Sequence, residues 1–121
     1  LVRLYGVGTY YTPTVYLNGS ITNISIDGNS ANITKKILTD LSKFYHVAFT
    51  VKAGEIKLYV NGELIHSVVA SIGYLNSPLK RIGWYGSVQQ WQGQIPVVMG
   101  YDRVITAQEV EQAYTYFKDK Y

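Results

Sequence analysis

The sequence predicts an all-β protein, an antiparallel sandwich or barrel that is closed by one short C-terminal α-helix. Three observations predict this class. Residues 44–67 contain two consecutive β-hairpin patterns, nine stretches of strand-type composition are separated by turn residues, and helical spacing occurs only after residue 105. A series of short strands with no helix between them is typical of antiparallel sandwiches and barrels.

The hairpin at Asn61-Gly62 specifies its strand pairing most tightly. Both residues tolerate a positive φ, which favours a two-residue type I′ turn. The strand before the turn alternates, with Ile56, Leu58 and Val60 on one face. A two-residue turn then predicts the cross-strand pairs Val60–Glu63, Leu58–Ile65 and Lys57–His66.

The other strands are predicted from β-branched and aromatic runs that are bounded by turn residues. The nine predicted strands are residues 2–5, 14–17, 21–26, 33–38, 44–51, 56–60, 64–70, 79–85 and 91–101. Asn18-Gly19 predicts a hairpin, Asp27–Ser30 a tight turn, and residues 86–90 a loop. Pro96 lacks an N–H donor, so it predicts a bulge or an edge position in the last strand.

The C-terminal helix is predicted by its first turn. Thr106-Ala107-Gln108-Glu109 is a capping box, in which the threonine hydroxyl accepts from the third helical amide and the glutamate reaches back. Val110, Ala113, Tyr114 and Phe117 follow at helical spacing. We therefore expect one face of this helix to pack on the strands.

Composition excludes several classes of protein. The 121 residues are enough for one domain with a core of its own. The absence of cysteine excludes disulfides, thiolate chemistry and cysteine-rich zinc sites. The net charge of +3 is scattered, which gives little support for nucleic-acid binding. Because no apolar run approaches the roughly 18–20 residues that cross a bilayer, we expect no membrane span.

Three stretches follow one another in an order that matches a known family. Residues 44–51 are similar to an aromatic-x-His-Val-Ala strand that leads into Tyr-Val-Asn-Gly at 59–62. Leu79–Gly83 is similar to a short strand ending in Ile-Gly. Trp91-x-Gly-x-Ile95, with the segment 101–110 after it, is similar to a closing strand that runs into a helix. Over residues 44–110 the chain resembles the laminin-G-like, concanavalin-A-like jelly-roll domains.

The resemblance implies a jelly-roll β-sandwich with a short C-terminal α-helix, in a single domain over residues 1–121. Domains of this family have front strands before the point where this chain begins, so we expect the C-terminal part of a longer polypeptide. Two positions depart from the family pattern. Pro96-Val97 stands where acidic residues usually follow the closing isoleucine, and Gly100 replaces a bulky core residue.

No catalytic residue is predicted. Glycoside hydrolases of this fold need two carboxylates held on one face, usually in a Glu-x-Asp-x-x-Glu motif, and the eight acids here are dispersed. The two histidines, His46 and His66, have no serine or cysteine nucleophile motif beside them. We interpret His46 as a packing or hydrogen-bonding residue of the sheet and His66 as a solvated strand residue.

Aromatic residues beside amides are the best candidate for a binding site. The candidates are Trp84, Tyr85, Gln89 and Gln90 around one predicted loop, and Tyr10 and Tyr11 near another. Exposed rings can stack on sugars while amides bind hydroxyl groups. The alternative is that these aromatics belong to the core. Because Trp84 and Tyr85 are neighbours on one predicted strand, they lie on opposite faces and we expect only one to be buried.

Calcium, which is common in this fold, is the cofactor considered for this chain. The candidate ligands are Asp27 and Asn29, with Asp102 as a second choice. Calcium takes about six to eight oxygen ligands. One aspartate and one asparagine supply too few of them, and both residue types are also favoured in turns. The turn interpretation is therefore preferred.

The resemblance implies a non-catalytic recognition or adhesion module that binds glycans or a protein surface. Its location would be extracellular, at a cell surface or at a virion surface. The alternative is a structural module that decorates or cements a viral capsid, fibre or phage tail and binds neighbouring subunits. A lectin predicts an aromatic platform or a metal at its loops, whereas a structural module predicts tyrosines and sheet edges buried against other subunits.

Overall fold

The described part of the chain contains eight strands and one helix. The computed structural model describes residues 14–17, 23–28, 31–36, 40, 42–52, 54–70, 84–85, 89–90 and 94–121, and for β1–β3, β7 and β8 it describes the backbone alone. The elements are β1 Thr14–Leu17, β2 Asn23–Gly28, β3 Ala31–Lys36, β4 Val47–Lys52, β5 Gly54–Val60, β6 Glu63–Ala70, β7 Trp84–Tyr85, β8 Gln89–Gln90 and α1 Ala107–Phe117. All strand pairs are antiparallel, so the predicted all-β class with a C-terminal helix is confirmed for these residues.

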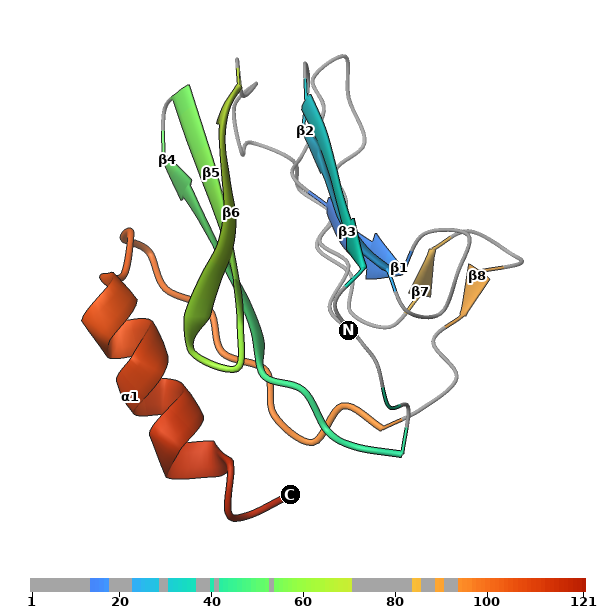
Figure 1. Ribbon diagram of the computed structural model, residues 1–121, viewed down its shortest axis with the longest axis vertical. Helices are drawn as coiled ribbons and strands as arrows, with labels where there is room; N and C mark the ends of the chain where they lie inside the picture. The colour runs from blue at the N-terminus through green and yellow to red at the C-terminus, as the bar shows by residue number, and fades with distance from the viewer. Residues whose placement is uncertain are drawn as a thin grey trace.

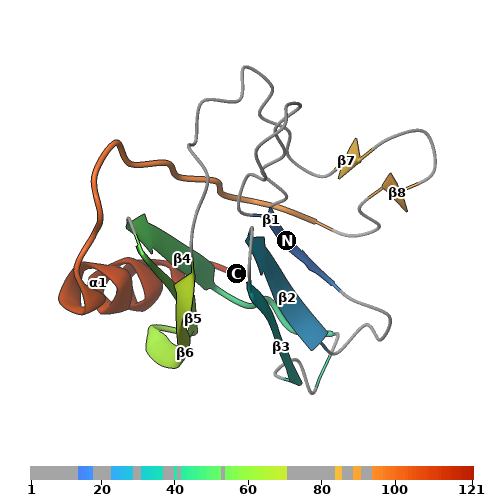
Figure 2. The same ribbon diagram turned by 90° about the horizontal axis from the view of Figure 1, so that it is seen from above.

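The strands form two three-stranded sheets and one two-stranded ribbon. The sheet orders are β1-β2-β3, β4-β5-β6 and β7-β8. The two larger sheets lie side by side, and β3 approaches β6 (Figure 1). Helix α1 lies on the side of the β4–β6 sheet that is away from β1–β3, and the β7–β8 ribbon lies at the far end of the molecule from α1 (Figures 1 and 2).

The β4–β6 sheet confirms both predicted hairpins. Lys52 pairs with Glu55 across the first turn, and Val60 pairs with Glu63 across the second. Asn61 and Gly62 have φ values of 51° and 84°, the positive values that a type I′ turn requires.

The predicted register is wrong beyond the first pairs of the second hairpin. Leu58 lies opposite His66 rather than Ile65, and Lys57 lies opposite Ser67. The register shifts between Leu58 and Tyr59, so that Ile65 is one extra residue on β6. Such a bulge bends and twists the strand locally. The turn length sets only the pairs that lie before the bulge.

The β1–β3 sheet confirms the predicted strands and the predicted hairpin between β1 and β2. Leu17 pairs with Ile24, which leaves six residues, 18–23, between the paired positions. Antiparallel pairing of β1 with β2 confirms the hairpin that Asn18-Gly19 predicted, and residues 18–22 lie outside the described residues. Gly28 pairs with Ala31 at the next connection, which leaves only residues 29 and 30 between the strands. That spacing agrees with the predicted tight turn.

The strand predicted at 91–101 is wrong for its described part, because residues 94–101 belong to no strand. Two residue types explain the difference. Pro96 has no N–H to donate to a sheet, and Gly100 has no side chain to pack. The loop predicted at 86–90 also needs correction, since Gln89-Gln90 forms β8. Residues 2–5 and 79–83 lie outside the described residues.

The core of the described part lies on β5 and α1. Its buried apolar residues are Ile56, Leu58, Tyr59, Val60 and Val110. Leu58 and Tyr59 are consecutive, so they lie on opposite faces of β5, and both are buried. Both faces of this central strand are therefore covered, in agreement with α1 on one side of the sheet and β1–β3 on the other (Figure 2).

Candidate functional site

The β7–β8 ribbon brings together four of the residues proposed for ligand binding. Trp84 pairs with Gln90, and Tyr85 pairs with Gln89. Directly paired residues of an antiparallel ribbon share a face, so each face has one aromatic residue and one glutamine. This arrangement joins a ring that can stack on a sugar to an amide that can bind hydroxyl groups. Tyr10 and Tyr11, the other two candidates, lie outside the described residues.

A second aromatic cluster was missed by the sequence reasoning. It consists of Phe44 before β4, Tyr116 and Phe117 at the end of α1, and Tyr121 after the helix. The ring centroids of Phe44 and Tyr121 are 5.9 Å apart, those of Phe117 and Tyr121 6.4 Å, and those of Tyr116 and Phe117 4.8 Å. Phe44, Tyr116 and Tyr121 are nevertheless exposed. The spacing of Phe117 and Tyr121, four residues apart, was the available signal.

Lys120 completes this cluster, which we call the C-terminal aromatic cluster. Its Nζ lies 3.4 Å from the centroid of the Tyr116 ring and 5.8 Å from that of Phe117. A cation in this position is attracted by the negative face of the ring. The hydrogen bond and the charge of Lys120 lower the pKa of the Tyr116 hydroxyl. The C-terminus, which ends in Tyr121 of this cluster, lies apart from the β7–β8 ribbon in both views (Figures 1 and 2).

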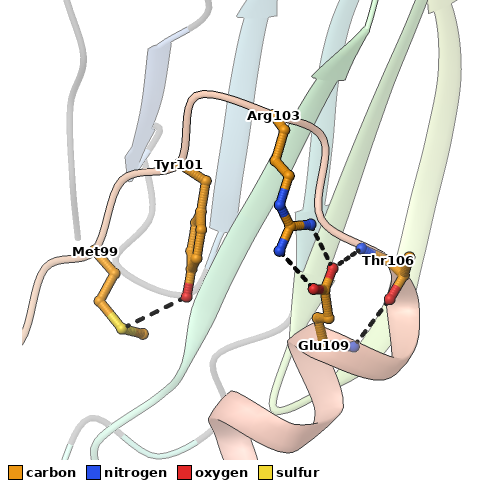
Figure 3. A network of polar contacts seen from close by, with 5 residues as sticks. All are labelled: Met99, Tyr101, Arg103, Thr106 and Glu109. Carbon is orange, nitrogen blue, oxygen red and sulfur yellow. Dashed lines mark hydrogen bonds and ion pairs between the residues drawn. The ribbon is translucent and has the colours of Figure 1, made fainter.

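The start of α1 is held by a network of polar contacts (Figure 3). Glu109 accepts two hydrogen bonds from the Arg103 guanidinium, at 2.6 and 2.9 Å, and one at 2.8 Å from the backbone N–H of Thr106. The Glu109 N–H in turn donates to the Thr106 hydroxyl at 3.2 Å. The predicted capping box is therefore confirmed, and Arg103 adds a bidentate ion pair to it.

Removing this cap tests how much the network stabilises the helix. We expect Thr106→Ala to lower the free energy of unfolding by about 1 kcal/mol, because the Glu109 N–H loses its acceptor. Urea denaturation followed by circular dichroism measures the change. Thr115→Ala, at an exposed position inside α1, is the matched control, and it should not destabilise because alanine favours helix. Equal stability losses in both variants would contradict a capping role for Thr106.

Three of the described carboxylates form ion pairs. Asp40 lies 3.6 Å from Lys43, Glu55 lies 3.5 Å from Lys57, and Glu109 contacts Arg103. The Arg103 hydrogen bonds, followed by that from the Thr106 N–H, lower the pKa of Glu109 to about 2. A general acid of a glycosidase needs a raised pKa instead. Glu109 is therefore suited to capping the helix and not to donating a proton.

The two histidines occupy different environments. His46 is half-buried, its ring centroid lies 6.1 Å from that of Tyr114 on α1, and burial lowers the pKa of its imidazole. This position agrees with the interpretation of His46 as a packing residue. His66 is half-buried on β6 and lies opposite Leu58, not opposite Lys57 as expected. The bulge at Ile65 accounts for this change of partner.

The candidate calcium ligands are only partly described. Asp27 lies in β2, paired with Thr14 on one side and Asn32 on the other, and Asn29 lies outside the described residues. Asp102 is exposed in the segment before α1. Among residues whose side chains are described, no three histidine, cysteine or acidic residues group closely enough to hold a metal ion. The described helix is also too short and too polar to cross a bilayer.

Comparison with known proteins identifies the family. The family described as the concanavalin A-like lectin/glucanases superfamily, of laminin G type, matches residues 5–111. No curated protein matches the chain. The fold is similar to that of an S-layer domain-containing protein from Clostridium thermocellum ATCC 27405 (residues 221–444), with a TM-score of 0.55 and 15% identity. That similarity covers 94% of this chain and 64% of the other. The chain belongs to the concanavalin A-like lectin/glucanase superfamily, whose fold is the jelly-roll β-sandwich.

Proposed function

We propose that this domain is a non-catalytic recognition module of a larger extracellular or surface protein, and that it binds glycans. Membership of a family of lectin-like and glucanase domains supports this proposal. The observation that supports it most is the pairing of Trp84 with Gln90 and of Tyr85 with Gln89. Aromatic rings beside amides are the chemistry that recognises sugars. The dispersed acids of the sequence support a binding role over hydrolysis, since glycosidases of this fold need two carboxylates held on one face.

The test is binding of the domain to a glycan array, with and without added calcium. We expect binding that the double variant Trp84→Ala, Tyr85→Ala abolishes, because both stacking surfaces are then absent. By analogy with other aromatic contacts, each ring removed should weaken sugar binding by about 0.5–1.5 kcal/mol beyond the loss of buried area. Circular dichroism and thermal denaturation of the double variant establish that it is folded.

A second double variant provides the matched control. Tyr116→Ala with Tyr121→Ala removes two exposed rings from the C-terminal aromatic cluster and leaves the β7–β8 ribbon unchanged. It should bind the same glycans as the unmodified domain. If this control alone loses binding, the glycan site lies on the C-terminal aromatic cluster. If the folded, unmodified domain binds no glycan with or without calcium, the glycan proposal is wrong. A requirement for calcium would favour the site at Asp27 and Asn29.

The second candidate is a structural module that binds neighbouring subunits of a surface or virion assembly. The exposed apolar residues favour it: Phe44, Leu64, Val69, Val98, Met99, Tyr101, Val104, Tyr116 and Tyr121. The similar solved structure belongs to an S-layer domain-containing protein, which is named for a surface layer. Light scattering over a range of concentrations tests this function. Self-association without glycan binding would support it, and a domain that stays monomeric would argue against pairing with its own copies.

A further inference from the structure

His46 lies where three parts of the described fold meet. Its backbone N–H donates to Asn61 Oδ1 at 3.1 Å, and its backbone carbonyl accepts from the backbone N–H of Asn61 at 2.8 Å. These bonds join the residue before β4 to the Asn61-Gly62 turn. The ring lies against Tyr114 of α1. Helix α1 also covers the turn, because the Tyr114 side chain and the Glu111 Cα lie within 3.4 Å of where a Cβ on Gly62 would stand.

The His46 ring has a buried polar atom without a partner. Nδ1 is buried, and among the described residues nothing forms a hydrogen bond with it. A neutral imidazole tolerates this environment better than an imidazolium, which would place a charge and a second donor there. The ionisable groups on the surrounding elements are Tyr114 with Glu111 and Lys118 on and after α1, Glu63 after the turn, and Tyr45 before His46. Burial alone accounts for the lowered pKa of His46, and none of these groups adds to it or offsets it.

We propose that protonation of His46 releases α1 from the β4–β6 sheet, so that the contact between helix and hairpins acts as an acid-sensitive latch. Protonation places a charge and a second donor on a ring whose Nδ1 is buried, and water reaches that atom most readily if the helix against the ring moves away. Among the described residues, none forms a backbone–backbone hydrogen bond with the segment 94–105 before α1. Release also moves α1 and Tyr121 away from Phe44, whose ring lies beside that of Tyr121, and so opens the C-terminal aromatic cluster.

The direction of the pH dependence follows from the two states of His46. With α1 docked, burial lowers the pKa of the imidazole. With α1 released, the ring returns toward the ordinary value of about 6.5. The released state therefore binds the proton more tightly. Docking is fully stabilised above about pH 6.5, and the stabilisation is lost as the pH falls through the pKa of the docked state.

Hydrogen exchange measured by mass spectrometry, at about pH 7.5 and about pH 5, tests the latch over the range in which histidine titrates. After correction for intrinsic exchange rates, we expect α1 to lose protection at the lower pH while β5 keeps it. His46→Phe retains a ring against Tyr114 but cannot be protonated, so α1 should stay protected at both pH values. His66→Phe changes the other histidine of the chain and should behave as the unmodified protein does.

Three results would overturn the proposal. They are protection of α1 that does not change with pH, a pH effect that survives in His46→Phe, and a pH effect that His66→Phe removes. If His46→Phe does not fold, His46→Gln takes its place. NMR titration of the His46 ring in the unmodified protein gives an independent answer, because a midpoint at or above about 6.5 would also contradict the latch.

Discussion

Replacing Leu58 with alanine is expected to lower the free energy of unfolding by about 2–5 kcal/mol. Leu58 is 0% exposed and lies on β5, the central strand of the β4–β6 sheet. Truncation removes buried methyl groups from contact and leaves a cavity that the neighbouring strands fill only in part. Urea denaturation followed by circular dichroism measures the change. A loss of this size is a large fraction of the stability of a typical domain.

Val69→Ala is the control for this prediction. Val69 lies on the neighbouring strand β6, but its side chain is 86% exposed. Shortening an exposed aliphatic side chain usually changes stability by no more than about 0.5 kcal/mol. Because both variants shorten an aliphatic residue of the same sheet, their difference reports burial and not strand composition. Equal losses of stability in Leu58→Ala and Val69→Ala would contradict the position of the core on β5.

Gly62→Ala is expected to cost about 1–2 kcal/mol from its backbone conformation alone, with a further loss where α1 meets the turn. Gly62 has a φ of 84°, a conformation that residues with a Cβ rarely adopt. An added Cβ would stand 3.1 Å from Tyr114 Cδ1 and 3.4 Å from the Glu111 backbone, so α1 would have to shift. Thermal denaturation gives the overall loss, and hydrogen exchange of α1 shows whether the helix has loosened.

Gly100→Ala is the matched control for Gly62→Ala. A Cβ at Gly100 meets no atom within 4 Å, and its φ lies outside the left-handed range. Alanine at such a position should be neutral or should stabilise by about 0.4–1 kcal/mol, because it restricts the unfolded chain. If Gly62→Ala is tolerated as well as Gly100→Ala, then neither the type I′ turn nor its contact with α1 is as tight as described here.

The hairpins and the helix were predictable because their signals are local. Asn61-Gly62 permits the positive φ values of the β-turn, and Thr106 with Glu109 forms the capping box. The two residues of each pair are at most three positions apart in the sequence. The match of the family to residues 5–111 likewise confirms the resemblance inferred from short motifs in a fixed order. In each case the favourable geometry is set by residues a few positions apart.

The register and the closing segment were predicted less well. Turn length predicts Val60 opposite Glu63, but it carries no information about the bulge that moves Leu58 opposite His66. The apolar run at 94–101 has strand composition, but no strand forms there. Pairing along a sheet depends on which strands lie alongside, and these can come from any part of the chain.

The candidate binding residues were likewise predictable only in part. The sequence indicated Trp84, Tyr85, Gln89 and Gln90 as a group, and their antiparallel pairing places one aromatic residue and one glutamine on each face of the ribbon. The sequence did not reveal the C-terminal aromatic cluster, because Phe44 is more than 70 residues before the aromatic residues that it contacts.

The sequence by itself determined the antiparallel class, the two hairpin turns, the start of α1 and the family. These depend on backbone preferences and on contacts between residues close in the sequence, which composition and spacing specify. Only the tertiary structure decided the bulge on β6, the burial of Tyr59 and the contact between His46 and Tyr114. Those features depend on residues that are distant in sequence, whose positions are set by how the sheet and the helix pack together.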